Sequence, residues 1–294
     1  MKFKFWSLFC ATLLIFSTGC SSKKKKHDAF AEKPEAAAVM PKNVAKGTPS
    51  NQLSPKTPEQ TKPPEAAVKV HHTLWSYRGL TGPEMWGDLK PEFQTCKSGK
   101  LQSPIDLKWA KPKKHGTITF QYNESPYQLM DNGHTVKAIF APGNFVTING
   151  DKYELVQMHF HSKSEHTISG KQYPLEAHFV HKDAKGNLAV IAVLFVEGHS
   201  NPFLESMWNQ FPKEKNRAVA STVSFNPANL IPKITTHYKY DGSLTTPPCS
   251  EGVSWNVFNT PMEVSKEQLD HFRVLYAHNF RPSQALNGRK VVNY

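Results

Sequence analysis

Three histidines are the residues in this sequence whose types and spacing best fit metal chemistry. His159 and His161 are two residues apart, so a β-strand through them places both imidazoles on one face. A second strand that carries His178 is long enough to pair antiparallel with the first, which brings the third imidazole within about 5 Å of the other two. Three neutral imidazoles that face one point are typical of a catalytic zinc site, in which the fourth tetrahedral position stays open.

Two polar residues strengthen this prediction. Gln157 precedes His159 by two residues and Glu176 precedes His178 by two, so each lies on the same strand face as its histidine. Such neighbours accept the second ring N–H of an imidazole, which fixes its tautomer and raises its basicity as a ligand. The alternative is an exposed polar face, the commonest setting of a lone His-x-His pair. A third histidine beside a carboxylate makes the metal site the sharper hypothesis.

Short β-rich runs separated by Gly, Pro, Asn and Asp dominate the chain after Trp75. The periodicity predicts strands over 118–122, 135–140, 145–148, 153–160, 175–181 and 188–195, with turns over 131–133, 149–151 and 183–187. Helices are predicted over 201–211 and 265–277, and the second opens with Ser265 followed by Glu267 and Gln268. We expect a mainly β fold, with a single domain on a largely antiparallel sheet and a few short peripheral helices.

The first 72 residues differ from the rest of the chain. Residues 1–20 combine Lys2 and Lys4 with an apolar run over 5–16 and end in Ser-Thr-Gly-Cys20, which is the pattern of a secretory signal. The small residues before Cys20 predict a lipoprotein, with Cys20 as the acylated residue; ordinary secretion and an uncleaved anchor are the alternatives. Residues 21–72 lack apolar periodicity, which predicts a disordered tether. We expect a folded domain over 73–294, exported to the periplasm or cell envelope and held at a membrane by an N-terminal lipid anchor.

The net charge of +12 arises mostly from this N-terminal segment. Residues 1–72 hold 12 of the 36 Lys and Arg residues but only 5 of the 24 acidic residues. The remaining chain shows neither a basic stripe interleaved with aromatic residues nor a DNA-binding motif. We therefore expect no nucleic-acid partner.

Cys96 and Cys249 are the two cysteines outside the predicted signal. In an exported protein such a pair is more often bridged than free, and closing a loop of about 150 residues contributes about 5 kcal/mol in the chain-entropy model. Neither cysteine belongs to a Cys-x-x-Cys motif, so redox catalysis and a second zinc site are not indicated. We expect a disulfide bond between them.

Motifs spread from Trp75 to the C-terminus resemble those of the α-class carbonic anhydrases, including exported bacterial members. In order they are Trp75-Ser-Tyr77, Gly82-Pro83, Trp86-Gly87, Gln102-Ser-Pro-Ile105, Asn132-Gly-His134, the His159/His161 strand, Ser164-Glu-His-Thr167, Glu176-Ala-His178, Ser243-Leu-Thr-Thr-Pro-Pro248 and Asn279-Phe-Arg-Pro282. The resemblance implies one domain on a twisted, ten-stranded, mostly antiparallel sheet, with Zn²⁺ at the bottom of a conical cleft. It also implies reversible hydration of carbon dioxide to bicarbonate and a proton through zinc-bound hydroxide, and, as in many bacterial relatives, a homodimer.

The resemblance assigns a role to each matching residue. The zinc ligands are His159, His161 and His178, supported from behind by Gln157, Glu176 and the backbone carbonyl of Asn279. Thr245 orients the hydroxide, Glu165 receives the hydroxyl hydrogen of this threonine, and His134 is the proton shuttle. The substrate-binding residues are Thr246 at the bicarbonate site and an apolar wall for carbon dioxide, made of Val180, Val190, Leu244, Val253 and Trp255.

Two other interpretations fit part of the pattern. The spacing His159-x-His161-x-x-x-Glu165 also suits a cupin-type metalloprotein, in which Glu165 ligates the metal, although the flanking glycines expected there are absent. The non-enzyme alternative is a carbonic-anhydrase-like binding module, and the intact zinc-ligand set argues against it. Lys137 departs from the family pattern, because a small polar side chain commonly lines the cleft at that position and Lys137 places a cation near the proton path.

Overall fold

The structure, a computed structural model, describes residues 74–113 and 116–294. The predicted signal with Cys20 and the predicted tether over 21–72 lie outside these residues. No helix within the described ranges is long and apolar enough to cross a membrane. All the predicted strands and helices fall inside the described part of the chain.

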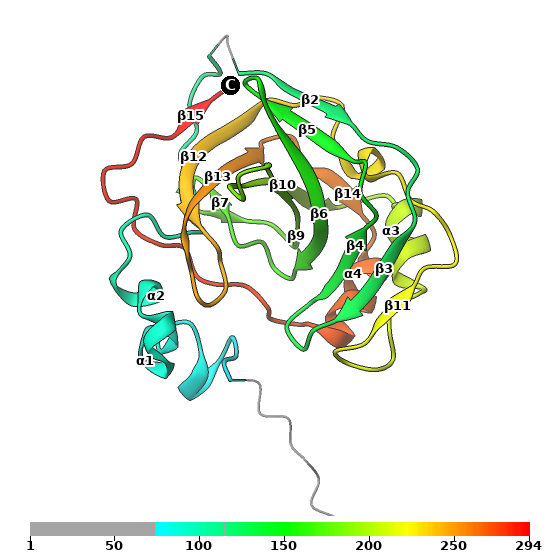
Figure 1. Cartoon of the computed structure of the whole chain (residues 1–294), viewed down its shortest axis with the longest axis horizontal. Coiled ribbons are helices and arrows are strands. Elements are labelled where there is room, and N and C mark those ends of the chain that lie inside the picture. The colour runs from blue at the N-terminus through cyan, green and yellow to red at the C-terminus, as the bar shows by residue number, and fades with distance from the viewer. Residues whose placement is uncertain (1–73, 114–115) are drawn as a thin grey trace, which may run out of the picture. The chain divides into compact units, whose positions relative to one another are not determined.

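A twisted twelve-stranded sheet forms the centre of the domain (Figure 1). Nine strands follow the order β11-β3-β4-β6-β9-β10-β13-β12-β15, while β5 pairs with β6, β2 with β5, and β14 with β10. The strands are β2 (Ile118–Gln121), β3 (Tyr127–Asp131), β4 (Val136–Phe140), β5 (Phe145–Ile148), β6 (Asp151–His161), β9 (Leu175–Lys182), β10 (Leu188–Glu197), β11 (Ala218–Ala220), β12 (His237–Ser243), β13 (Glu251–Phe258), β14 (Met262–Val264) and β15 (Val292–Asn293). The two strands that carry the histidines, β6 and β9, are neighbours near the middle of this order.

The sheet is mixed and has two strands more than the ten expected. Most pairs are antiparallel, as predicted, but β10 pairs in parallel with β13 and, further along, with β14. A parallel pair requires a crossover connection, and here the chain between β10 and β13 provides one that contains a helix and two further strands. The strands beyond the expected ten are short pieces at the ends of the sheet, such as β11 and β15, which the periodicity of the sequence does not reveal.

Helices are few and short, as the sequence predicts. They are α1 (Trp86–Leu89), α2 (Thr95–Ser98), α3 (Pro202–Trp208) and α4 (Lys266–Leu275), with 3₁₀ turns η1 (Gly79–Thr81), η2 (Pro91–Phe93) and η3 (Pro227–Leu230). The predicted start of α4 is confirmed, because Ser265 and Gln268 form a capping box. The first predicted helix is shorter than expected: α3 ends at Trp208, ahead of Pro212, whose ring disfavours helical geometry in the residue before it. A separate three-stranded sheet is formed by β1 (Asp106–Leu107), β7 (Thr167–Ile168) and β8 (Lys171–Gln172).

A bulge in β6 decides which side chains reach the core. The pairing of β6 with β9 skips Val156, so Leu155 lies opposite His181 while Gln157 lies opposite Val180. Leu155 therefore packs in the main core with Met158 and Phe160 instead of sharing the face of the histidines. On the far side of that core α3 and α4 cover the sheet, and Trp208 and Phe272 contact Phe160 at ring-centroid distances of 5.8 and 6.0 Å.

The predicted disulfide is confirmed. Cys96 in α2 and Cys249 after β12 are bonded, with 5.0 Å between their Cα atoms and a sequence separation of 153. The bond fastens the segment that carries α1 and α2 to the loop between β12 and β13. That loop carries Thr245 and Thr246, and the backbone N–H of Cys249 donates to the carbonyl of Thr246 at 2.9 Å.

Candidate active site

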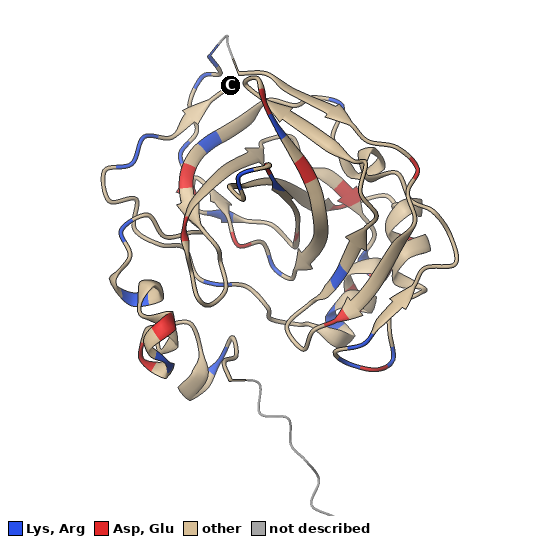
Figure 2. Ribbon diagram, in the orientation of Figure 1, with Lys and Arg blue, Asp and Glu red and all other residues tan. Residues whose placement is uncertain are grey.

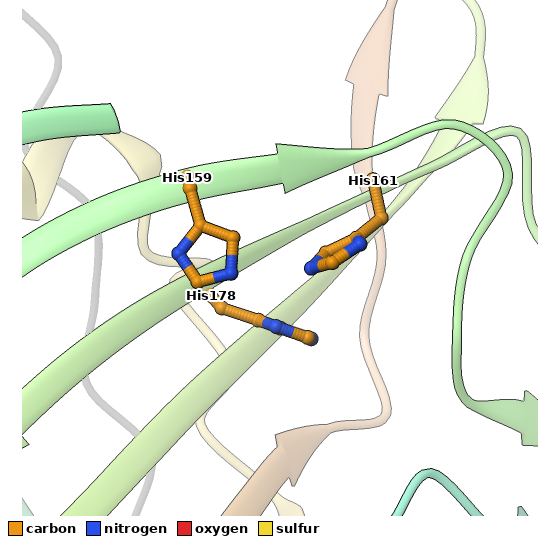
Figure 3. A group of neighbouring side chains, drawn as sticks. All are labelled: His159, His161 and His178. Atoms are coloured by element: carbon orange, nitrogen blue, oxygen red, sulfur yellow. The ribbon is translucent and has the colours of Figure 1, made fainter. Parts of the chain in front are cut away.

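The three predicted histidines converge in space. In the β6–β9 ladder His159 lies directly opposite His178, and the two-residue period of β6 brings His161 to the same face. One ring nitrogen from each of the three lies within 4.8 Å of the others, and Figure 3 shows the rings turned toward a common point. This arrangement confirms the convergence inferred from the spacing alone.

The outer nitrogen of each imidazole is hydrogen-bonded. Neutral imidazole has one N–H, and donating it to an oxygen leaves a lone pair on the opposite nitrogen. The bonds run from His159 Nδ1 to Gln157 Oε1 at 2.9 Å, from His161 Nδ1 to the carbonyl oxygen of Asn279 at 2.6 Å, and from His178 Nε2 to Glu176 Oε1 at 2.8 Å. The free lone pairs are therefore on Nε2 of His159, Nε2 of His161 and Nδ1 of His178.

The electrostatics of the three histidines also suit a metal. Burial is the main cause that lowers the pKa of each of them, to about 4 for His161, so the neutral ligand form prevails at pH 7. His161 Nε2 is buried and has no hydrogen-bond partner among the described residues. A buried lone pair without a donor is costly, and a zinc ion at the common point supplies what all three nitrogens lack. The residues present therefore fit Zn²⁺.

A second group of possible metal ligands lies behind the first. His166, Glu176 and His178 also bring ligand atoms within 4.8 Å of one another. Their facing atoms already bond to each other, since Glu176 Oε1 accepts from His166 Nδ1 at 2.7 Å as well as from His178. Tyr240 occupies the other side of the His166 ring at 2.7 Å, and its hydroxyl in turn contacts Ser103. This buried network supports the histidine cluster, and its mutual hydrogen bonds leave no ligand atom free for a second metal.

Glu165 is buried beneath the histidines. Its Oε1 accepts from the backbone N–H of Arg281 at 2.8 Å, and its Oε2, 3.9 Å from His178 Nδ1, has no hydrogen-bond partner among the described residues. Burial raises the pKa of Glu165 to about 7, against the opposite effects of His178 and of the nearby Thr245 hydroxyl. The cupin interpretation needs Glu165 among the metal ligands, but the cluster of facing ligand atoms contains the three histidines without it.

A cleft opens above the three histidines, with a volume of about 190 Å³. One wall is apolar and contains Val180, Val190, Leu244 and Trp255. The other predicted member of this wall, Val253, belongs to the same buried apolar cluster as Val190 and Trp255 but is not among the residues that line the cleft. Thr245 and Thr246 lie beside the apolar wall, and the opposite wall is polar, with Asn132, His134, Thr135, Lys137 and Gln157.

His134 lies on the turn between β3 and β4, on the polar wall. The Asn132 side chain accepts from the backbone N–H groups of His134 and Thr135 at 3.0 and 2.9 Å, and Gly133 adopts a φ of 84°, which favours glycine. Burial, together with the charges of Lys137 and Lys215, lowers the pKa of His134 to about 4.

Trp75 covers His134, and neither Trp75 nor Tyr77 was predicted to belong to the site. The Trp75 ring stacks on the imidazole with a centroid distance of 3.6 Å and an interplanar angle of 4°. It is held in turn by Tyr77 and Trp86 at 5.4 and 5.1 Å. Both aromatic residues belong to a motif that the sequence analysis identified, but sequence spacing does not reveal that a segment 59 positions upstream of His134 returns to this turn.

Comparison with known proteins agrees with the geometry. The family model for eukaryotic-type carbonic anhydrase matches residues 81–294. A carbonic anhydrase of Pectobacterium carotovorum is 41% identical over 229 residues, which cover 78% of this chain and 93% of that protein. Among solved structures, an α-carbonic anhydrase of Thermovibrio ammonificans in complex with the inhibitor sulfanilamide is 46% identical with a TM-score of 0.72, covering 74% of this chain and 98% of its own. A hyperthermostable carbonic anhydrase from a hydrothermal vent chimney is 47% identical with a TM-score of 0.71, covering 74% and 99%. These matches show that the chain belongs to the eukaryotic-type, or α, carbonic anhydrase family, whose members use zinc to hydrate carbon dioxide reversibly.

Proposed function

We propose that His159, His161 and His178 hold the zinc ion with which this enzyme hydrates carbon dioxide to bicarbonate and a proton. The observation that carries the proposal is the set of three imidazoles, two buried and one half-buried, whose outer nitrogens are all hydrogen-bonded and whose inner nitrogens face one point. When bound, zinc supplies a water molecule with a pKa near 7, a value known from carbonic anhydrase itself, so that hydroxide is available at neutral pH. The remaining steps depend on residues of this chain.

Thr245 and Glu165 orient the nucleophile. Glu165 Oε2 is buried and accepts no hydrogen bond from any residue that the structure describes, and the nearby Thr245 hydroxyl can donate one. When the Thr245 hydroxyl donates its hydrogen bond to Glu165, Thr245 Oγ1 can only accept a further hydrogen bond. It therefore accepts one from the nucleophile, which directs an oxygen lone pair of the nucleophile at the substrate. The backbone N–H of Arg281 fixes the other oxygen of Glu165, which keeps the carboxylate in place.

Different residues of the cleft contact the substrate and the product. Carbon dioxide has no net charge, so the apolar wall formed by Val180, Val190, Leu244 and Trp255 is sufficient to hold it beside the nucleophile. Thr246 offers a hydroxyl to the bicarbonate that forms. His134 then carries the released proton out of the cleft through its ring nitrogens, which form no hydrogen bond to any described residue, although its low pKa of about 4 makes accepting the proton uphill at neutral pH.

The proposed domain division places this chemistry in residues 73–294, beyond a signal peptide over 1–20 and a tether over 21–72. The support is compositional for the first two segments, and the family model begins at residue 81. Removing residues 1–72 is expected to leave carbon dioxide hydration within about twofold of that of the full chain, because that segment shows no core-forming pattern. Activity below a tenth of the full-length value contradicts this division.

Export, lipid attachment at Cys20 and a homodimer are further parts of the proposal. The disulfide supports export, because such bonds persist in oxidising compartments such as the periplasm. Mass spectrometry of the mature N-terminus tests acylation at Cys20, and light scattering of the purified domain tests the dimer. An unmodified N-terminus downstream of Cys20 indicates ordinary secretion instead.

The central experiment measures zinc content and carbon dioxide hydration on one preparation, with and without a sulfonamide. We expect one zinc per chain and activity that the sulfonamide abolishes. A protein that folds and binds zinc but does not hydrate carbon dioxide would point to the binding module instead.

A further inference from the structure

Lys137 differs from most other charged residues of the domain. Basic and acidic residues are interspersed along the ribbon (Figure 2), and the ion pairs formed by lysine and arginine join side chains that are mostly exposed. Lys137 is half-buried, and within the described part of the chain it forms no ion pair and no side-chain hydrogen bond. An ammonium group that is partly removed from water without a counter-charge is destabilising unless an anion pairs with it.

The position of Lys137 directs its charge into the cleft. On β4 the core side is occupied by Val136, Ala138 and Phe140, so Lys137 lies on the opposite face. In the β4–β6 ladder it lies directly opposite His159, and paired residues of an antiparallel ladder have side chains on the same face. Lys137 therefore lines the cleft beside a proposed zinc ligand.

No acidic side chain lines this cleft within the described residues. The positive charge of Lys137 acts on two neighbouring imidazoles. It lowers the pKa of His134 and that of His159, in each case after the larger effect of burial. Lys137 is also the one side chain of the described lining that carries a charge at neutral pH, because the lowered pKa values of the lining histidines keep those rings neutral. The polar wall thus presents a single positive charge to whatever enters.

We propose that Lys137 strengthens the binding of bicarbonate and other small monovalent anions in the cleft, because it adds a positive charge to the polar wall. This inference rests on the proposed function, in which one reaction partner is an anion and the other, carbon dioxide, is neutral. A fixed positive charge discriminates between the two, because it attracts bicarbonate and leaves carbon dioxide to the apolar wall. Lys137 thus favours bicarbonate, whereas the apolar wall favours carbon dioxide.

The test compares thiocyanate binding by isothermal titration calorimetry in four zinc-loaded proteins: wild type, Lys137→Gln, Lys137→Arg and Lys215→Gln. Lys215 is the matched control, because its charge also lowers the pKa of His134 but its side chain lies outside the cleft lining. The buffer contains no chloride and has an ionic strength of about 0.1 M, at which distant charges are largely screened. Bicarbonate is measured in competition with thiocyanate.

We expect Lys137→Gln to weaken thiocyanate and bicarbonate binding by about five- to tenfold, whereas Lys215→Gln stays within about twofold of wild type. Lys137→Arg should bind like wild type; because arginine does not release its proton, this result separates anion binding from proton transfer. Equal losses in Lys137→Gln and Lys215→Gln, or no loss in either, overturn the inference.

Zinc content, unfolding temperature and hydration activity are measured on the same samples. If the wild type is active and Lys137→Gln binds both anions normally, the inference about Lys137 is wrong and the proposed function stands. An inactive wild type contradicts the proposed function, and a loss of thiocyanate affinity confined to Lys137→Gln still supports an anion site there.

Discussion

The three zinc-facing histidines and His134 occupy the same cleft but are held in opposite ways. Each of the three lies on a central strand or at its end, is buried or nearly so, and has its outer ring nitrogen hydrogen-bonded to the protein. The ring of His134 lies on a turn and forms no hydrogen bond to any described residue, and its main contact is the stack on Trp75. The difference matches their proposed tasks, because a metal ligand must keep one tautomer and one orientation, whereas a proton carrier must exchange protons through its ring nitrogens.

Removing one ligand is expected to have the largest effect. His161→Ala leaves two imidazoles at the common point and should lower both zinc content and carbon dioxide hydration, the latter by more than about a thousandfold, because an ion with two protein ligands is weakly bound and badly placed. Metal analysis and stopped-flow hydration check this. His199→Ala is the control, since that side chain is 93% exposed and lies outside the cleft lining. Stoichiometric zinc and normal activity in His161→Ala would remove this residue from the ligand set.

The hydrogen bonds behind the ligands should have the next largest effect. Gln157→Ala deletes the acceptor 2.9 Å from His159 Nδ1 without removing a ligand, and we expect zinc affinity to fall by about ten- to a hundredfold. Chelator competition measures the dissociation constant. Gln157→Glu keeps an acceptor at the same place and should bind zinc at least as tightly as wild type. If both variants lose affinity equally, packing rather than the hydrogen bond is responsible.

His134→Ala separates proton transfer from chemistry. The substitution leaves the proposed ligands, Thr245 and the apolar wall in place, so kcat/KM for hydration should be nearly unchanged, while kcat should fall by about tenfold because proton export slows. Imidazole at high concentration should restore much of the lost kcat. Equal decreases in kcat and kcat/KM without rescue would instead indicate a structural role for His134.

The smallest effect is expected from uncovering His134. Burial is the largest cause of its low pKa of about 4, and Trp75 provides part of that cover. Trp75→Ala should admit water, favour the charged imidazolium and raise the pKa of His134 toward its ordinary value of about 6.5. A more basic imidazole accepts the proton at a smaller free-energy cost, so kcat should rise by about two- to threefold.

Nuclear magnetic resonance titration of the His134 ring checks this shift, and stability provides a second readout. Because the folded pKa of His134 is below the unfolded value, its contribution to stability is complete above about pH 6.5 and is lost as the pH falls toward 4. Trp75→Ala should therefore reduce the dependence of stability on pH in this window. A His134 ring that still titrates near 4 in the variant would show that the nearby lysines, not the tryptophan cover, set its pKa.

The sequence predicts the strands that carry the three histidines better than the strands on the far side of β10. The alternation through His159 and His161 and the run around His178 are both found where the spacing places them. By contrast, β12 and β13 were not predicted, although most of their residues are buried. They carry His237 and Asn256, which are 2% and 0% exposed, and buried polar residues hide the apolar period on which strand prediction depends.

Local chemistry along the chain is what the sequence alone determined. Two-residue spacing puts His159 with His161, and Gln157 and Glu176 with their histidines, because side chains alternate along any strand. The capping box at Ser265 and the pairing of the two domain cysteines follow from residue types and compartment in the same way. None of these features depends on where distant segments lie.

The features that arise from contacts between distant segments were decided only by the tertiary structure. The bulge at Val156, the return of Trp75 over His134 and the half-buried ammonium of Lys137 without a counter-charge each depend on segments that are distant in sequence but meet in the folded domain. Sequence spacing specifies which face of a strand a side chain takes, whereas the packing of neighbouring segments decides whether that face is open, covered or charged.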